Sequence, residues 1–215
     1  MKERFVRTLL LLLILIFSLA GAVQAAPQRI VSLAPSITEN LFALGVGDRV
    51  VGVTSWCDYP REAASRVIIG DALNLNLELL LSLEPDLVVG DSTLVQSYLE
   101  KLKELGVATF VVGPTTVAEV QASLVELGEA VGAKERGLEL AEHMNSRLTE
   151  LVESTERSRK IRVFMEIWNE PLMTVGPGSF MNELIVLAAR DVAARRGRCI
   201  LESPLSAWVR LLASL

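Results

Sequence analysis

Three segments of this chain share one pattern, and they run Arg29-Ile-Val-Ser-Leu-Ala-Pro-Ser-Ile-Thr-Glu39, Val51-Gly-Val-Thr-Ser-Trp-Cys-Asp-Tyr-Pro60 and Asn76-Leu-Glu-Leu-Leu-Leu-Ser-Leu-Glu-Pro-Asp-Leu-Val-Val-Gly90. In each, an apolar run lies beside a loop of Ser, Pro, Asp or an aromatic residue. Such runs are typical of buried parallel strands, and open α/β sheets hold their ligands at the carboxyl ends of those strands. The pattern therefore favours a binding cleft over a catalytic apparatus.

Strands and helices alternate through the first half of the chain. The predicted strands are Ile30–Leu33, Val50–Thr54, Val67–Ile69, Leu87–Val89 and Ala108–Val112. Ser36 is positioned to cap the first helix, with Glu39 completing a capping box. Because the strands are too apolar for a sheet with one wet face, we expect a parallel sheet covered by helices on both sides.

The second half of the chain has a different succession of predicted helices and strands. Residues 116 to 158 contain helical patterns and no strand candidate, which suggests a rigid connector. A strand at Ile161–Ile167 follows, Leu172–Val175 is a candidate partner for it, and Gly176-Pro-Gly-Ser179 begins another helix. The predicted fold is α/β, with two Rossmann-like lobes whose parallel sheets are joined by a long backbone helix.

The first 25 residues have the features of a secretory signal peptide. Lys2, Arg4 and Arg7 precede the apolar run Leu9–Phe17, and small residues lead to a predicted cleavage site after Ala25. A membrane anchor is the alternative, but the run is shorter than the roughly 20 apolar residues that span a bilayer. No Cys lies near the cut. We therefore expect a periplasmic protein without a lipid anchor.

Charge divides the remaining chain into two unequal parts. The formal net charge is −5, and removal of the basic leader makes the mature chain more acidic, which disfavours nucleic acid and favours a basic partner. Residues 190–215, however, hold five Arg and no Lys. We interpret this tail as the aberrant end of an incomplete second lobe; an ordinary basic helix over Ser203–Leu215 is the alternative.

These observations predict four regions along the chain. They are a signal peptide at 1–25, an N-terminal α/β lobe at 26–115, a helical backbone linker at 116–160 and a partial C-terminal α/β lobe at 161–215, whose last 26 residues form the aberrant tail.

Signals for catalysis, metals or cofactors are weak. The one histidine, His143, lies among charged residues on a predicted helix, and no G-x-S-x-G or G-x-G-x-x-G motif occurs. Cys57 and Cys199 have no spacing that predicts a metal site, and a disulfide between them stays open. The sequence predicts neither an enzyme nor a bound cofactor, with an exported hydrolase as the alternative of another class.

Four motifs in order give the chain a family resemblance. They are SLAPS-x-TE, the TS-aromatic-x-DYP loop, NLE-x6-PDLV and GPGSF-x-NEL. The chain resembles the helical-backbone (class III) periplasmic substrate-binding proteins of cobalamin and iron-siderophore ABC importers, and the cobalamin-binding members most. The resemblance implies a monomer that encloses a flat corrin between two lobes and delivers it to an ABC permease of the inner membrane; a ferric siderophore or haem is the alternative ligand.

The resemblance also implies site residues. The candidate ligand-binding positions are Pro35, Ser36, Trp56, Asp71, Asn74, Asp91, Ser92, Trp168, Gly178 and Phe180. Trp56 and Trp168 offer stiff apolar surfaces to a macrocycle, although Trp56 as a core aromatic is the alternative. Glu78 matches the first-lobe glutamate that docks on permease arginines; locally it is also compatible with a solvated helix face. Gly176–Ser179 fits either an anion-binding turn or a plain strand-to-helix turn.

Overall fold

The computed structural model of the chain describes residues 25–71, 74–91, 95–155, 164–176 and 178–189. Most of the predicted signal peptide, together with Ser92 and the tail from residue 190, lies outside these ranges. Within them, no helix has both the length and the apolar character needed to cross a membrane.

A five-stranded parallel sheet organises the first part of the chain. Its strands are β1 (Ile30–Ser32), β2 (Val50–Val53), β3 (Val67–Ile68), β4 (Leu87–Asp91) and β5 (Thr109–Val112). The spatial order is β3-β2-β1-β4-β5, and every neighbouring pair is parallel. All five carboxyl ends therefore lie at one edge. The predicted α/β class and the five first-half strands are confirmed, with bounds shifted by one or two residues.

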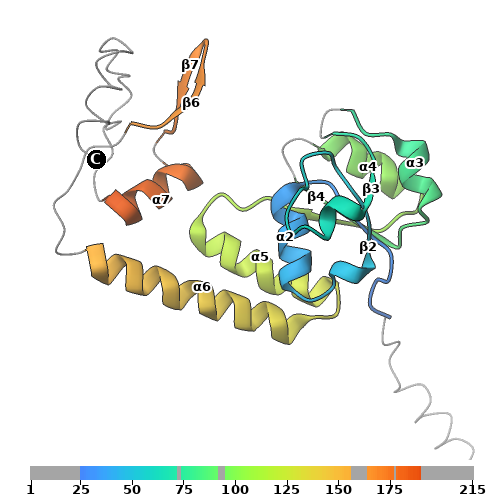
Figure 1. Cartoon of the computed structure of the whole chain (residues 1–215), viewed down its shortest axis with the longest axis horizontal. Helices are drawn as coiled ribbons and strands as arrows, with labels where there is room; N and C mark the ends of the chain where they lie inside the picture. The colour runs from blue at the N-terminus through green and yellow to red at the C-terminus, as the bar shows by residue number, and fades with distance from the viewer. Residues whose placement is uncertain (1–24, 72–73, 92–94, 156–163, 177, 190–215) are drawn as a thin grey trace, which may run out of the picture.

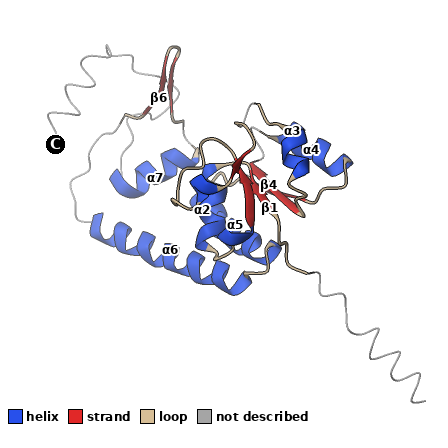
Figure 2. Cartoon of the chain, turned by 45° about the vertical axis from the view of Figure 1, so that its right-hand side comes forward, coloured by secondary structure: helices blue, strands red, loops and turns tan. Residues whose placement is uncertain are grey.

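Helices cover both faces of this sheet, as Figures 1 and 2 show. They are α2 (Pro35–Ala43), α3 (Leu77–Ser82), α4 (Gln96–Glu104) and α5 (Val117–Ala130), with 3₁₀ turns at Gly47–Arg49 and Ala63–Ser65. Successive residues of a strand point to opposite faces of the sheet, so they contribute to two hydrophobic cores, one on each face. Ile30 packs in a cluster with residues of α2 and α5, whereas its neighbour Val31 packs in a cluster with residues of α3 and α4.

The first helix begins differently from the prediction. Ala34 is the N-cap, Pro35 is the first helical residue and the cap makes no side-chain hydrogen bond, so the predicted Ser36–Glu39 capping box is wrong. Proline suits this position because its φ is already helical and it has no N–H to satisfy. The turn is fixed instead by a buried pair, in which the Thr38 hydroxyl donates to Ser32 Oγ at 2.8 Å.

Two helices, rather than one, follow the sheet. α5 ends at Ala130 and α6 (Lys134–Thr155) returns along it, with Gly132 at a φ of 73° in the connection. The two helices approach closely, since a Cβ built on Gly137 would lie 2.7 Å from the carbonyl oxygen of Leu124. α5 belongs to the first core through its buried Leu127.

The second part consists, as far as it is described, of a hairpin and a helix. β6 (Glu166–Asn169) and β7 (Leu172–Thr174) pair antiparallel, and α7 (Phe180–Ala189) packs against α5 and α6. A two-residue connection permits only antiparallel pairing. The predicted strand Ile161–Ile167 overlaps β6 at Glu166 and Ile167, and residues 161–163 lie outside the described ranges. Its predicted pairing with Leu172–Val175 is confirmed for this overlap, whereas the parallel arrangement expected for this lobe is not seen in the residues described.

Candidate functional site

The strand order places a switch point between β1 and β4. The chain leaves β1 towards β2 on one side and returns to β4 on the other, so the loops after β1 and β4 diverge there. Pro35 and Ser36 follow β1 and are exposed. Asp91 is the last residue of β4, is half-buried and pairs in register with Val112. Three predicted site residues thus lie at the edge where such sheets hold ligands.

The loop after β2 presents two aromatic side chains to solvent. Cys57 points into the core with 3% exposure, and its Sγ lies 3.2 Å from Thr54 Oγ1. Its neighbour Trp56 is 70% exposed, and Tyr59 is 66% exposed. The alternative of Trp56 as a core aromatic is therefore wrong. Cys57 carries a free thiol, while Cys199 lies outside the described residues.

Asp71 and Asn74 meet in a turn after β3. Asp71 Oδ1 accepts the backbone N–H of Asn74 at 2.8 Å and lies 3.4 Å from its side-chain Nδ2. Gly70, at a φ of 113°, allows the tight turn, and its carbonyl accepts the N–H of Ser55 at 2.9 Å. The bond from Ser55 ties this turn to the Trp56 loop.

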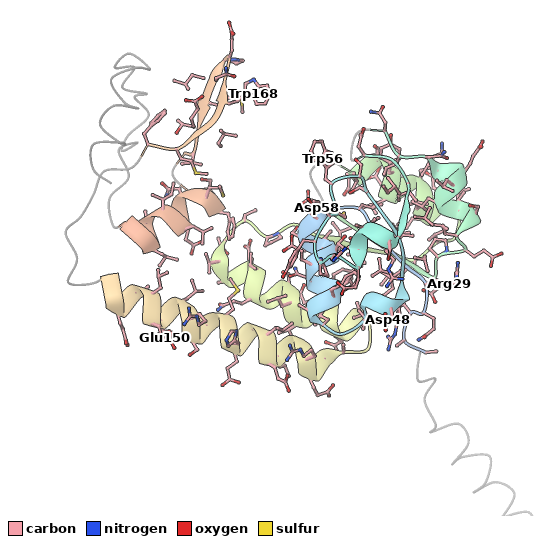
Figure 3. The ribbon with its side chains drawn as sticks, viewed as in Figure 1. Arg29, Asp48, Trp56, Asp58, Glu150 and Trp168 are labelled. Atoms are coloured by element: carbon pink, nitrogen blue, oxygen red, sulfur yellow. The ribbon has the colours of Figure 1, made fainter. Side chains whose placement is uncertain are left out.

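The second part carries the other three candidates. Trp168 lies within β6, is 59% exposed, and its Nε1–H donates to the carbonyl of Glu170 at 2.9 Å. Gly178 is exposed with a φ of 83°, and Phe180 is half-buried at the start of α7. Figure 3 shows Trp56 and Trp168 on the same side of the chain, opposite α6, on the first and second parts respectively.

Glu78 lies in the first turn of α3, four residues after Asn74. Asn76 caps that helix by accepting the N–H of Leu79 at 3.0 Å, and the Glu78 side chain is exposed. Exposure is compatible with docking and equally with a solvated helix face, so its docking role stays a prediction.

Sequence reasoning missed two residues. Tyr59 belongs to the quoted TS-aromatic-x-DYP loop, and its position in that polar loop was the available signal. Glu183 belongs to the quoted NEL motif, and its Oε2 accepts the N–H of Val117 at 2.8 Å. Nothing in the sequence pattern links those two positions, which are 66 residues apart.

Glu119 holds the start of α5 at the same edge of the sheet. The backbone N–H and the hydroxyl of Thr115 both donate to Glu119 Oε2, at 2.7 and 2.8 Å. These two bonds, the backbone one first, hold the pKa of Glu119 below its ordinary value of 4.5.

Acid should therefore weaken the fold through Glu119. A lowered folded-state pKa contributes stability that is present above pH 4.5 and is lost as the pH falls through the folded pKa. We expect the stability difference between the wild type and Glu119→Gln to be constant near neutrality and to shrink below that value. Urea unfolding at a series of pH values measures it. Glu126→Gln, on the same helix, is the control, and a difference that persists unchanged in acid would contradict the assignment.

Known proteins share the sequence family and the fold of this chain. The sequence profile described as periplasmic binding protein matches residues 30–205. The chain is 35% identical over 181 residues to the uncharacterized ABC transporter substrate-binding lipoprotein YvrC of Bacillus subtilis, which covers 80% of this chain and 57% of YvrC. The crystal structure of the periplasmic vitamin B12 binding protein BtuF of Vibrio cholerae matches with a TM-score of 0.68 at 28% identity, over 76% of this chain and 65% of BtuF.

A haem-binding protein is equally similar. The periplasmic heme-binding protein RhuT of Roseiflexus sp. RS-1 matches with a TM-score of 0.68 at 28% identity, over 75% of this chain and 64% of RhuT. The chain spans less than two thirds of the length of each of these three relatives. The shared fold is thus common to proteins named for different ligands.

Proposed function

This chain belongs to the periplasmic binding protein family, and we propose that it captures a corrinoid such as cobalamin outside the cytoplasm and delivers it to an ABC-type permease. The observation that carries the proposal is the exposure of Trp56, 70%, on a loop that shares one sheet edge with the turns of Asp71 and Asp91. Together with Tyr59, which is 66% exposed on the same loop, this indole offers an aromatic surface on which an apolar ligand face can pack.

The chemistry of a corrinoid suits this edge. Its flat macrocycle presents a broad apolar face, on which an aromatic side chain packs with little loss of rotamer entropy. Its rim carries amide groups, which donate and accept hydrogen bonds. In the proposed complex, Asp71, Asn74 and Asp91 of the first lobe form hydrogen bonds with these amide groups. Trp168 and Phe180 contact the ligand from the second lobe. Pro35, Ser36, Ser92 and Gly178 complete the proposed binding set.

Calorimetric titration with cyanocobalamin tests the proposal. We expect saturable binding with a Kd of about 1 μM or tighter, since ordering one rigid ligand costs little side-chain entropy. Haemin and a ferric siderophore are titrated in parallel under the same conditions. Absence of heat and of a native mass-spectrometric complex with cyanocobalamin, from a chain whose circular dichroism shows the α/β fold, would refute the corrinoid assignment.

Haem is the second candidate ligand, and Tyr59 favours it. Its phenol is 66% exposed three residues after Trp56, and a tyrosine oxygen can serve as an axial ligand to haem iron. Tyr59→Phe separates the two candidates, because it would weaken haem binding by removal of an iron ligand and leave corrinoid stacking on Trp56 unchanged.

A catalytic role is the alternative of a different class. His143 is exposed on α6, and in the described part of the chain no three His, Cys, Asp or Glu side chains cluster to hold a metal. We propose a binder that acts as a monomer and has no catalytic residue or resident cofactor.

Delivery should depend on Glu78. In Glu78→Arg the docking charge is reversed while the strand-end loops are untouched, so we expect ligand affinity within about twofold of the wild type and a loss of uptake of tenfold or more. Growth of a strain that depends on this importer, together with the titration above, measures both. Glu126→Arg, an exposed reversal on α5, is the matched control. Equal losses of ligand binding and uptake in Glu78→Arg would contradict the proposal that ligand binding and permease docking use separate surfaces.

A further inference from the structure

The amino end of α5 lies where the two parts of the chain meet. β5 ends at Val112, and α5 begins five residues later at Val117. Glu183, in the first turn of α7, accepts the backbone N–H of Val117 through its Oε2 at 2.8 Å. This hydrogen bond joins the edge of the first sheet to the helix that follows the Gly176–Ser179 loop.

The N–H of Val117 has no acceptor within its own helix, as holds for the first four N–H groups of any α-helix. The donors of Thr115 and Glu119 at this end have local acceptors. Thr116 Oγ1 accepts the N–H of Glu119 at 3.2 Å, and Glu119 accepts from Thr115. The Val117 side chain is 5% exposed, so an unpaired N–H there is costly. The carboxylate of Glu183 therefore provides an acceptor for the N–H of Val117, which has no acceptor among the residues next to it in the chain.

Glu183 is itself held firmly to the loop before α7. Ser179 Oγ accepts the N–H of Asn182 at 3.2 Å, and the Ser179 carbonyl accepts the N–H of Glu183 at 3.0 Å. The Ser179 hydroxyl in turn donates to the carbonyl of Gly176 at 2.8 Å. A movement of Glu183 relative to Val117 therefore moves the whole turn that carries Gly178 and Phe180.

We propose that Glu183 is a positioning residue that fixes the orientation of the second part relative to the first. Bonds from an N–H to a carboxylate are short and directional, and the helix amino end adds a favourable field. α7 packs on α5 and α6 as well, so the Glu183 bond selects one orientation from those that this packing allows. The consequence for ligand binding rests on the proposed function; the consequence for orientation does not.

Distances between spin labels test the orientation without any ligand. Labels are placed on the full chain at Lys101→Cys of α4 and Met181→Cys of α7, both exposed positions, in a background of Cys57→Ala and Cys199→Ser. We expect a single narrow distance distribution for the otherwise unaltered chain. In Glu183→Ala, the distribution should broaden or split, because the selected orientation loses its fixed bond.

Two further variants separate geometry from charge. Glu183→Gln keeps the length and one acceptor oxygen, so the narrow distribution should largely return. Glu183→Asp keeps the charge and is one methylene too short, so it should resemble Glu183→Ala. Glu126→Ala is the matched control, because it removes an exposed carboxylate from α5 without breaking a bond to the second part or at the amino end of the helix; its distribution should stay narrow.

An unchanged distribution in Glu183→Ala, or equal broadening in Glu126→Ala, would overturn the proposal. So would loss of the first-lobe fold in Glu183→Ala, because the bond would then serve folding. If the chain binds a corrinoid, Glu183→Ala should weaken binding by about fivefold through the reduced fraction of binding-competent chains. A chain that binds no corrinoid and yet shows the expected distance changes would refute the proposed ligand and leave the positioning role intact.

Discussion

Trp56→Ala is expected to weaken corrinoid binding by about 2–4 kcal/mol, or roughly 30- to 1,000-fold, which is the range for a central aromatic anchor. The indole is 70% exposed in the free chain, so it has most of its surface to lose to a ligand. The same exposure means that its removal should change the free energy of unfolding by less than about 0.5 kcal/mol. Titration calorimetry and urea unfolding of the same preparation measure the two quantities.

The control for Trp56→Ala is another exposed apolar side chain far from the strand-end loops. Leu105 is 54% exposed at the end of α4, on the side where the chain enters β5 rather than leaves it. Leu105→Ala should leave binding unchanged. Trp56→Phe should retain most of the affinity, because a smaller ring still stacks. Equal losses at Trp56 and Leu105 would argue against a ligand at the carboxyl edge of the sheet.

The parts of the fold that sequence predicts well are those set by local physics. The β1–β5 strands follow from short apolar runs. Their parallel direction follows from the connections between them, which are helical except between β2 and β3, where only a 3₁₀ turn lies. The break between α5 and α6 was missed because Gly132 lies in a continuous helical pattern and only its positive φ ends the helix. The start of α2 was misplaced by two residues, since the observed N-cap is Ala34 and not Ser36. A proline start and a Ser36 cap compete, and local sequence does not decide between them.

The candidate site likewise contains features that local sequence predicts and one that depends on how distant helices pack. The exposure of Trp56 could be predicted because the residues around it are polar and Cys57 takes the inward position. The turn that joins Asp71 to Asn74 follows from residue types that form such turns. The bond from Val117 to Glu183 could not be predicted, because it depends on how α7 packs against α5 and no periodicity spans the 66 residues between them.

The largest stability effect is expected where α5 and α6 touch. Gly137 faces the backbone of α5, and a Cβ there would lie 2.7 Å from the Leu124 carbonyl oxygen and 3.1 Å from the Val125 Cα. Backbone atoms cannot rotate away as a side chain can, so the helices must separate. Gly137→Val should lower the free energy of unfolding by about 3 kcal/mol, the upper end for overpacking, and urea unfolding followed by circular dichroism measures it.

Ser146→Val provides the control for this substitution, because it places the same β-branched residue at an exposed position of α6 and so isolates helix propensity. Its cost should be below about 0.7 kcal/mol. Since α5 carries Leu127 in the first core and Val117 in the bond to Glu183, separation of α5 from α6 should also disturb the orientation of α7. Gly137→Val should therefore broaden the distribution between labels at positions 101 and 181, whereas Ser146→Val should not. A Gly137→Val chain as stable as Ser146→Val would show that the close approach of the two helices is not required by the fold.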